Sequence, residues 1–110
     1  MNTKKFFKFD IPSSVVGVVI SVCNDYERRR LAIEKGDLPE KSKDICERIN
    51  DSIDGVLEEI EPGIRRVILR DISCRRGYRC SQASGIISEN AYYRRKHKII
   101  HDIAQSIGLI

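Results

Sequence analysis

An apolar repeat in the middle of the sequence is the strongest constraint on what this chain can fold into. Between residues 45 and 60, Ile, Val and Leu recur at intervals of four, four, three, one and three residues. This spacing places the side chains on one face of an α-helix, because the helix has 3.6 residues per turn. The repeat consists of Ile45, Ile49, Ile53, Val56, Leu57 and Ile60. Charged residues fill the other face, so the sequence predicts an amphipathic helix packed on a core.

Proline and glycine residues indicate where the other helices begin and end. A helix is predicted from about Pro12 to Lys35, because Gly36 follows it as a C-terminal cap. Pro39 fits the first turn of the amphipathic helix, and Pro62 fits the first turn of the next one. Strand signals are weak. The pattern therefore predicts an all-α fold of about five helices.

The last third of the chain predicts a short helix, a tight turn and a long helix. The short helix is expected over residues 81–87, with Ser81 as its cap. Ser88 is expected to cap the long helix, which runs to about Ile107 with Gly108 past its end. We expect residues 1–60 to form an N-terminal helical segment for packing or oligomerisation. Residues 61–110 are expected to form a helix-turn-helix, with both segments in one compact domain.

Charge is distributed unequally between these two segments. Residues 1–60 carry 10 Lys and Arg against 12 Asp and Glu, whereas residues 61–110 carry 10 against 4. Clustered cations attract phosphates and displace their counterions, so the C-terminal segment is predicted to bind a polyanion such as double-stranded DNA.

The long helix over 88–107 separates apolar from polar side chains. Its inward face is centred on Ile99, Ile100 and Ile103, and Tyr92 falls on the same face. Tyr93 and Arg95 lie on the flanks. The outward face is predicted to hold Asn90, Ala91, Arg94, His97, Lys98, His101 and Gln105. Arg and Asn make bidentate contacts to guanine and adenine edges, so this face is typical of a helix that enters the major groove.

Two resemblances accompany this pattern. Residues 57–95 resemble region 4 of bacterial sigma factors, with matching positions at Pro62, Arg66, Val67, Ile68, Gly77, Ile87 and Ser88. The wider chain is similar to the ArpU/RinA-type regulators of late transcription in phages and prophages. The similarity lies in the Asp-Tyr-Glu-Arg sequence at 25–28, and in the closing segment from Ser88 to Leu109 with its Tyr-Tyr-Arg and Ile-Ala-x-x-Ile-Gly-Leu sequences.

The resemblance implies a sequence-specific DNA-binding regulator that activates transcription of phage or prophage genes. Carried over by position, the residues that contact bases are Asn90, Ala91, Arg94 and Lys98. The residues that contact the DNA backbone are Arg79, Ser81, Gln82, Ser88, Tyr93 and Arg95. RNA polymerase is a second candidate partner, and the sequence leaves open whether it is contacted directly. The apolar run over residues 15–21 could serve as a homodimer face.

The spacing of the cysteines and histidines argues against a metal site. Cys74, Cys80, His97 and His101 are spaced C-x5-C-x16-H-x3-H. The gap between the two cysteines and the gap between Cys80 and His97 are both longer than the corresponding gaps of a zinc finger. We therefore expect no metal. We also expect no cofactor and no enzymatic activity, because phosphate-binding loops and supported nucleophiles are missing from the sequence. The alternative function is an interaction module that binds polymerase or a sigma factor without DNA specificity of its own.

Cysteine usage and hydropathy indicate the compartment. Cys23 and Cys46 lie in apolar patterns typical of small core residues, which favours a reducing, cytoplasmic location. The apolar run at residues 15–23 is too short to span a bilayer, so no membrane association is expected.

Overall fold

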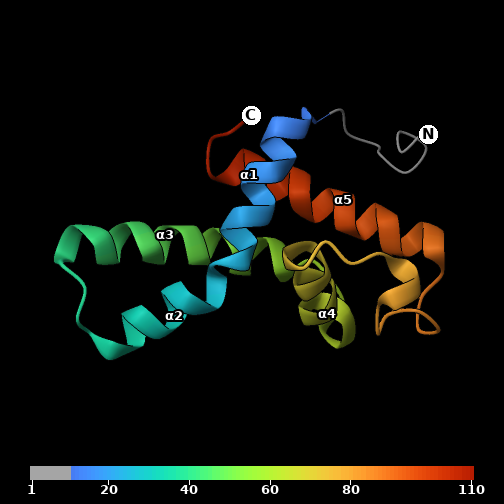
Figure 1. The fold of residues 1–110 in the computed structure, drawn as a ribbon, viewed down its shortest axis with the longest axis horizontal. Helices are drawn as coiled ribbons and strands as arrows, with labels where there is room; N and C mark the ends of the chain where they lie inside the picture. Colours follow the sequence, from blue (N-terminus) through green and yellow to red (C-terminus); the bar gives the residue numbers. More distant parts are fainter. Residues whose placement is uncertain (1–10) are drawn as a thin grey trace.

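The computed structural model describes residues 11–110 and is all-helical, as the sequence predicts. Its α-helices are α1 (Ser13–Asn24), α2 (Tyr26–Lys35), α3 (Glu40–Leu57), α4 (Pro62–Ser73) and α5 (Glu89–Ser106). A 3₁₀ turn, η2 (Tyr78–Cys80), lies between α4 and α5. The molecule is elongated, with extents of 44 × 28 × 21 Å (Figure 1). No helix in this described range is long and apolar enough to cross a membrane.

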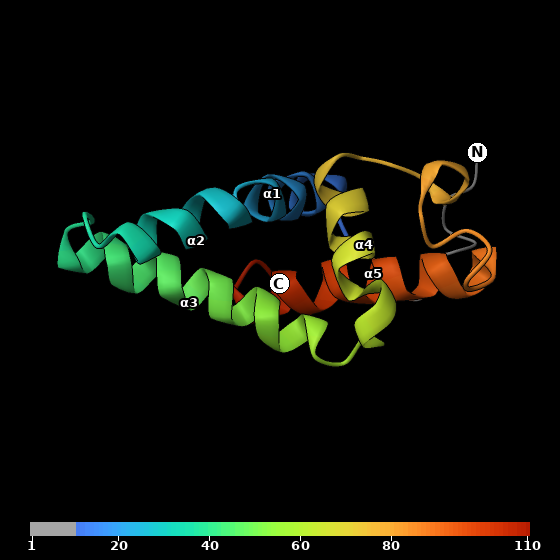
Figure 2. The ribbon, with the colours of Figure 1, turned by 90° about the horizontal axis from the view of Figure 1, so that it is seen from below.

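One end of the molecule is a helical arm made of α2 and the first half of α3. The two helices run side by side and are joined by a loop that begins with Gly36 (Figures 1 and 2). Gly36 ends α2 in the left-handed backbone conformation, with a φ of +75°, which glycine adopts easily. Away from the arm, the second half of α3 packs on α5. Ile45 is 53% exposed and lies in the first half of α3, beside α2. The apolar repeat therefore enters the core only from Ile49 onward.

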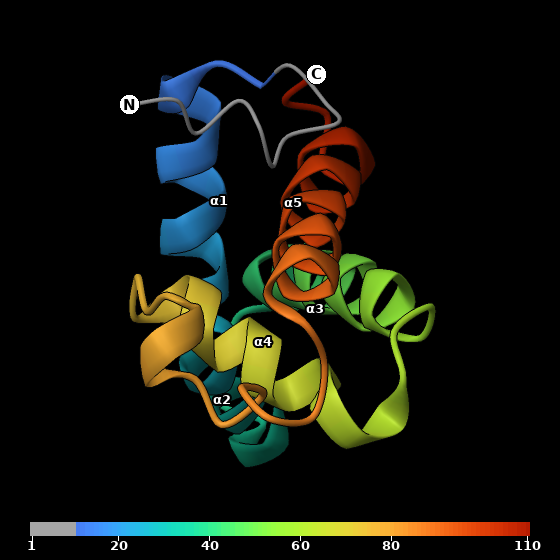
Figure 3. The same ribbon diagram turned by 90° about the vertical axis from the view of Figure 1, so that its right-hand side faces the viewer.

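The other end is a body in which helices from both halves of the chain share one core. Helix α1 packs on α4 and α5, and Figure 1 shows α1 crossing the C-terminal part of α5 at a steep angle (the view in Figure 3 looks nearly along α5). The apolar side chains with no more than 2% exposure are Val19, Ile53, Ile64, Ile68, Ile72, Ala83, Tyr92, Ile99, Ile103 and Ala104. The apolar faces predicted on α3 and α5 meet in this cluster together with the isoleucines of α4. Helix α1 thus belongs to the core, although its Val18 is 46% exposed.

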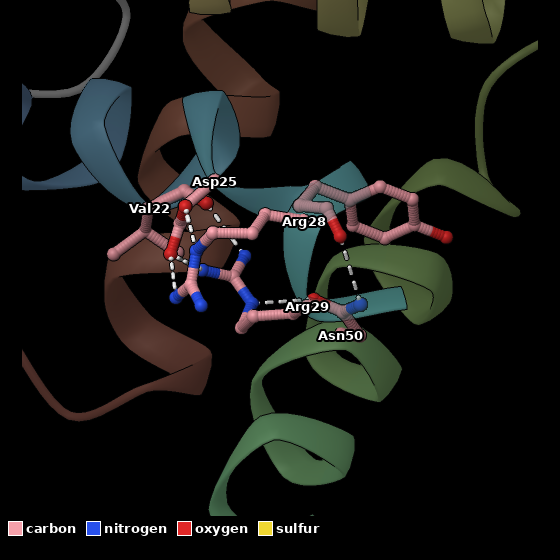
Figure 4. Close-up of polar contacts among 6 residues, drawn as sticks. Val22, Asp25, Arg28, Arg29 and Asn50 are labelled. Carbon is pink, nitrogen blue, oxygen red and sulfur yellow. Dashed lines mark hydrogen bonds and ion pairs between the residues drawn. The ribbon is translucent and has the colours of Figure 1, made fainter. Parts of the chain in front are cut away.

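The prediction of one helix from Pro12 to Lys35 is wrong, because the chain bends at Asp25. The bend is held by Arg29, a buried arginine on α2. Its Nη2 donates to the carbonyl oxygen of Val22 at 2.6 Å, and its Nε donates to Oδ1 of Asn50 on α3 at 2.7 Å (Figure 4). Asn50 in turn donates to the carbonyl oxygen of Tyr26 at 3.2 Å. The guanidinium thereby connects α1, α2 and α3, and the bend needs neither glycine nor proline.

The prediction of a helix over residues 81–87 is also wrong. The segment is a series of turns with a single bridge between Ser84 and Ile87, and η2 precedes it. Side chains compete there for the backbone groups that a helix would use. Ser81 Oγ accepts from the Ala83 N–H at 3.0 Å, and the Tyr78 hydroxyl donates to the Ile87 carbonyl oxygen at 2.7 Å. The helix-turn-helix predicted over residues 61–110 therefore lacks its expected first helix.

Candidate nucleic-acid interface

The candidate interface begins at the capped N-terminus of α5. Ser88 is extended, with φ −70° and ψ 160°, and its Oγ accepts from the Ala91 N–H at 3.2 Å. Glu89 lies in the first turn, where a negative charge is favourable beside the positive end of the helix. The predicted cap is confirmed, and it fixes the direction in which α5 leaves the body.

Two of the four predicted base-contacting residues are fully available on the surface of α5. Asn90 and Arg94 are exposed and lie one turn apart, so their side chains project from the same side of the helix. Ala91, beside them, is half-buried. An amide and a guanidinium at this spacing offer the donors and acceptors that read purine edges in the major groove.

The other predicted cations on this side of α5 are held by carboxylates. Arg95 Nε donates to Glu61 Oε1 at 2.8 Å, and the Arg95 Nη2 and Glu61 Oε2 atoms complete a bidentate pair. Lys98 Nζ lies 3.0 Å from Glu59 Oε1 and 2.5 Å from Asp102 Oδ2. The hydrogen bond from Arg95 lowers the pKa of Glu61 to about 2. Both cations thus have intramolecular partners that a DNA phosphate must displace.

The aromatic side chains of α5 face inward. The Tyr92 ring makes edge-on contacts with the rings of Tyr78 and Tyr93, at centroid distances of 5.4 and 5.1 Å. The Tyr93 hydroxyl accepts from the Tyr78 N–H at 3.3 Å. Lys96 Nζ donates to the Arg76 carbonyl oxygen at 2.8 Å, and burial lowers the pKa of this lysine. The half-buried Tyr93, predicted to contact DNA, is therefore engaged in holding the α4–α5 loop.

The predicted outward position of His97 is wrong, because the residue is only 6% exposed. The isoleucine stripe suggested a narrow buried face, but α1, α3 and α4 all pack against α5. Three neighbouring helices bury a wider arc than one stripe requires, and His97 lies within that arc. Its ring is 6.1 Å from the ring of Tyr93.

The loop over residues 74–88 supplies the other candidate contacts to the DNA backbone. Arg79 and Gln82 are exposed, as a phosphate contact requires. Ser81 is 5% exposed and its hydroxyl is used within the loop, so its predicted place at the surface is wrong. The reason is the absent helix: Ser81 caps no helix, and it turns inward to stabilise the turn before Ala83.

Arg75 is a candidate contact that sequence reasoning missed. It is exposed and has a φ of +55°, the only positive value for a residue other than glycine in the described chain. The Arg75 N–H donates to the Ile72 carbonyl oxygen at 3.2 Å, and the Arg76 N–H donates to that of Asp71 at 2.7 Å. This pair of bonds is a Schellman motif, in which glycine is the usual left-handed residue.

The end of α5 shows the same motif built with glycine. There the Gly108 N–H donates to the Gln105 carbonyl oxygen at 3.2 Å, and the Leu109 N–H donates to that of Ala104 at 2.8 Å. Gly108 has a φ of +83°. Arginine is thus held at a position where glycine avoids a conformational cost, and such strain is typical of residues kept for function. The first glycine after α4 is Gly77, two residues past the left-handed position, so the sequence alone does not place that position at Arg75.

The cysteines and histidines considered for zinc do not form a metal cluster. Across residues 11–110 no group of three Cys, His, Asp or Glu side chains is placed to hold a metal ion. Cys74 and Cys80 are free and exposed, whereas His97 is buried. His101 Nδ1 lies 2.9 Å from Oδ1 of Asp102. The four-residue spacing of the two histidines follows from their positions on α5.

Comparison with known proteins found no relative of this chain. No family model matches the chain, and neither does any curated protein or solved structure.

Proposed function

We propose that this chain is a sequence-specific DNA-binding regulator that activates transcription of phage or prophage genes. The N-terminal half of α5 enters the major groove, where Asn90 and Arg94 contact base edges. The single observation that carries the proposal is that both side chains are exposed, one turn apart, near the N-terminus of α5. This end of α5 is capped by Ser88, and the rest of the helix packs in the core. A helix anchored in this way presents its side chains in a fixed direction, as base contacts require.

The α4–α5 loop supplies contacts to the DNA backbone in this proposal. Arg75 and Arg79 are exposed in the loop that leads to α5, and Figure 3 shows this loop beside the first turns of the helix. Gln82 adds a neutral donor. These residues fix the position of α5 on the duplex and carry no sequence information themselves. The loop and η2 thus take the place of the first helix of a helix-turn-helix.

The proposal is tested by selecting bound duplexes from a random DNA pool and titrating the selected site at fixed salt. Arg94→Ala should weaken binding to that site by about 1–3 kcal/mol and relax the preference at one base pair. Arg48→Ala, which removes an exposed arginine from α3, is the matched control and should bind like the original chain. Failure to enrich any sequence, or equal binding by both variants, would contradict the proposal.

A second candidate function is a module that binds polymerase or a sigma factor. It is favoured by the exposed apolar side chains of the arm, Leu31 at 50% and Ile45 at 53%. Salt dependence separates the two functions, because binding to phosphates weakens steeply as salt rises and apolar contact does not. A pull-down of polymerase that is lost in a Leu31→Ser, Ile45→Ser double variant would support this second function.

A further inference from the structure

The turn between α3 and α4 places two carboxylates against the side of α5 proposed to face DNA. Glu61 holds Arg95 through a bidentate pair, and Glu59 Oε1 lies 3.0 Å from Lys98 Nζ. Along α5, Arg95 directly follows Arg94, and Lys98 lies about one turn after Arg94. The turn therefore brings negative charge to the edge of the surface that would approach phosphates.

These carboxylates are held in place by the structure of the turn. Ile60, between them, is 4% exposed, and its N–H donates to the Leu57 carbonyl oxygen at 3.0 Å. The Ile60 carbonyl oxygen accepts from Arg65 Nε at 3.1 Å and from Nη2 at 2.7 Å. A buried side chain and an arginine clamp fix the backbone, so Glu59 and Glu61 are presented to α5 in a defined geometry.

We propose that Glu59 and Glu61 are specificity-determining residues, because they restrain two cations that would otherwise add sequence-independent contacts to phosphate. This inference rests on the proposed DNA-binding function. Phosphates compete with the two carboxylates for Arg95 and Lys98, and they are repelled by the same carboxylates. Contacts to phosphate strengthen binding to every sequence, whereas contacts from Asn90 and Arg94 discriminate between sequences. Restraining Arg95 and Lys98 therefore raises the share of binding that depends on sequence.

The test compares Glu59→Gln, Glu61→Gln double variants with the original chain on the selected duplex and on a scrambled one. The variant keeps the size of both side chains, and exposed ion pairs contribute little to folding, so it should fold normally. Glu58→Gln is the matched control, because Glu58 is exposed in the same turn and its side chain has no ion pair in the described structure. Circular dichroism checks that both variants fold.

The double variant should bind the scrambled duplex more tightly at about 0.1 M salt, since Arg95 becomes available to a phosphate while Lys98 keeps its pair with Asp102. The slope of log K against log salt should become steeper by about 0.9, the value for one added phosphate contact. Its preference for the selected duplex should fall, and Arg95→Ala in the double variant should partly reverse the gain.

Three other results overturn specific statements. If the double variant matches Glu58→Gln in affinity and slope while Arg94→Ala still weakens the original chain, the role of the carboxylates is wrong and the DNA-binding function stands. Weaker binding by the double variant to both duplexes also overturns the role, because it would show that the carboxylates orient α5 for binding. If the original chain binds no duplex, both proposals fall.

Discussion

The Tyr92 hydroxyl donates a 2.8 Å hydrogen bond to Oδ2 of Asp71 inside the core, joining α5 to the last turn of α4. Tyr92 is fully buried and Asp71 is 1% exposed. Arg76 Nη1 approaches the other carboxylate oxygen at 3.8 Å. A carboxylate this deeply buried is stable only where donors surround it. This pair therefore fixes the relative position of the two elements that flank the α4–α5 loop.

Tyr92→Phe should lower the free energy of unfolding by about 1–3 kcal/mol, because Asp71 loses its buried donor. Urea denaturation followed by circular dichroism measures the change.

The burial of Tyr92 and its bond to Asp71 raise the pKa of the hydroxyl, so the folded state retains this proton to a higher pH than the unfolded state does. Stability in the original chain should fall above about pH 10. The phenylalanine variant should lose part of that alkaline dependence, and an unchanged profile would contradict the assignment.

Asn50→Ala should destabilise the protein by about 2–3 kcal/mol, because Arg29 keeps its buried charge but loses an acceptor. The neighbouring Arg28 offers a matched control. It pairs with Asp25 at 2.5 Å but is exposed, so Arg28→Ala should cost less than about 1 kcal/mol. Thermal unfolding of the two variants in parallel measures the difference. Equal effects would show that the bend between α1 and α2 does not depend on the bonds of Arg29.

Arg75→Gly should raise the free energy of unfolding by about 1 kcal/mol, because glycine adopts positive φ without the cost that arginine bears. The same substitution should weaken DNA binding by removing a phosphate contact. Gly108→Ala is the reciprocal control and should lower stability, since alanine is strained at a φ of +83°. Chemical denaturation and a DNA titration together show whether stability and binding move in opposite directions.

The Glu61–Arg95 pair should give a defined acid dependence. Arg95 lowers the pKa of Glu61 from 4.5 to about 2, so the folded state holds this proton more weakly than the unfolded state. The stabilising effect is therefore complete above about pH 5 and is lost as pH falls toward 2. In Glu61→Gln the melting temperature should depend less on pH between about 5 and 2 than in the original chain. High salt should reduce this difference between the two proteins. An equally reduced pH dependence in Glu58→Gln would contradict the prediction.

The sequence predicted best those helices whose ends are marked by single residues. Pro62 begins α4, and Ser88 caps α5, as expected from their local chemistry. The break at Asp25 was missed because it depends on a contact between Arg29 and Asn50, which are 21 residues apart. The absent helix over 81–87 was missed because the Tyr78 hydroxyl and Ser81 compete for its backbone groups. The burial of His97 depends on which helices surround α5, and periodicity within α5 does not contain that information.

The same limit applies to the candidate site. Exposure of Asn90 and Arg94 followed from the helical period, because both lie opposite the isoleucines of α5. Asp102 contacts Lys98 from one turn away on the same helix, but Glu61 on Arg95 and Glu59 on Lys98 are 34 and 39 positions away, in a turn that the sequence marked only as a helix break. Long-range pairing of this kind follows from the tertiary arrangement, and local patterns do not predict it.

The arm of α2 and α3 has a consequence for how the protein opens in solution. Helix α2 packs chiefly on α3, and the buried residues of α2 are only Tyr26 and Arg29, both in its first four positions. Amide hydrogens near Gly36 should therefore exchange through local opening, whereas those of α4 and the middle of α5 exchange only when the whole core unfolds. The loop at residues 36–39 is then the first place where a protease cuts the native protein. The arm, at one end of the elongated molecule, can thus change conformation while the surface proposed to bind DNA stays folded.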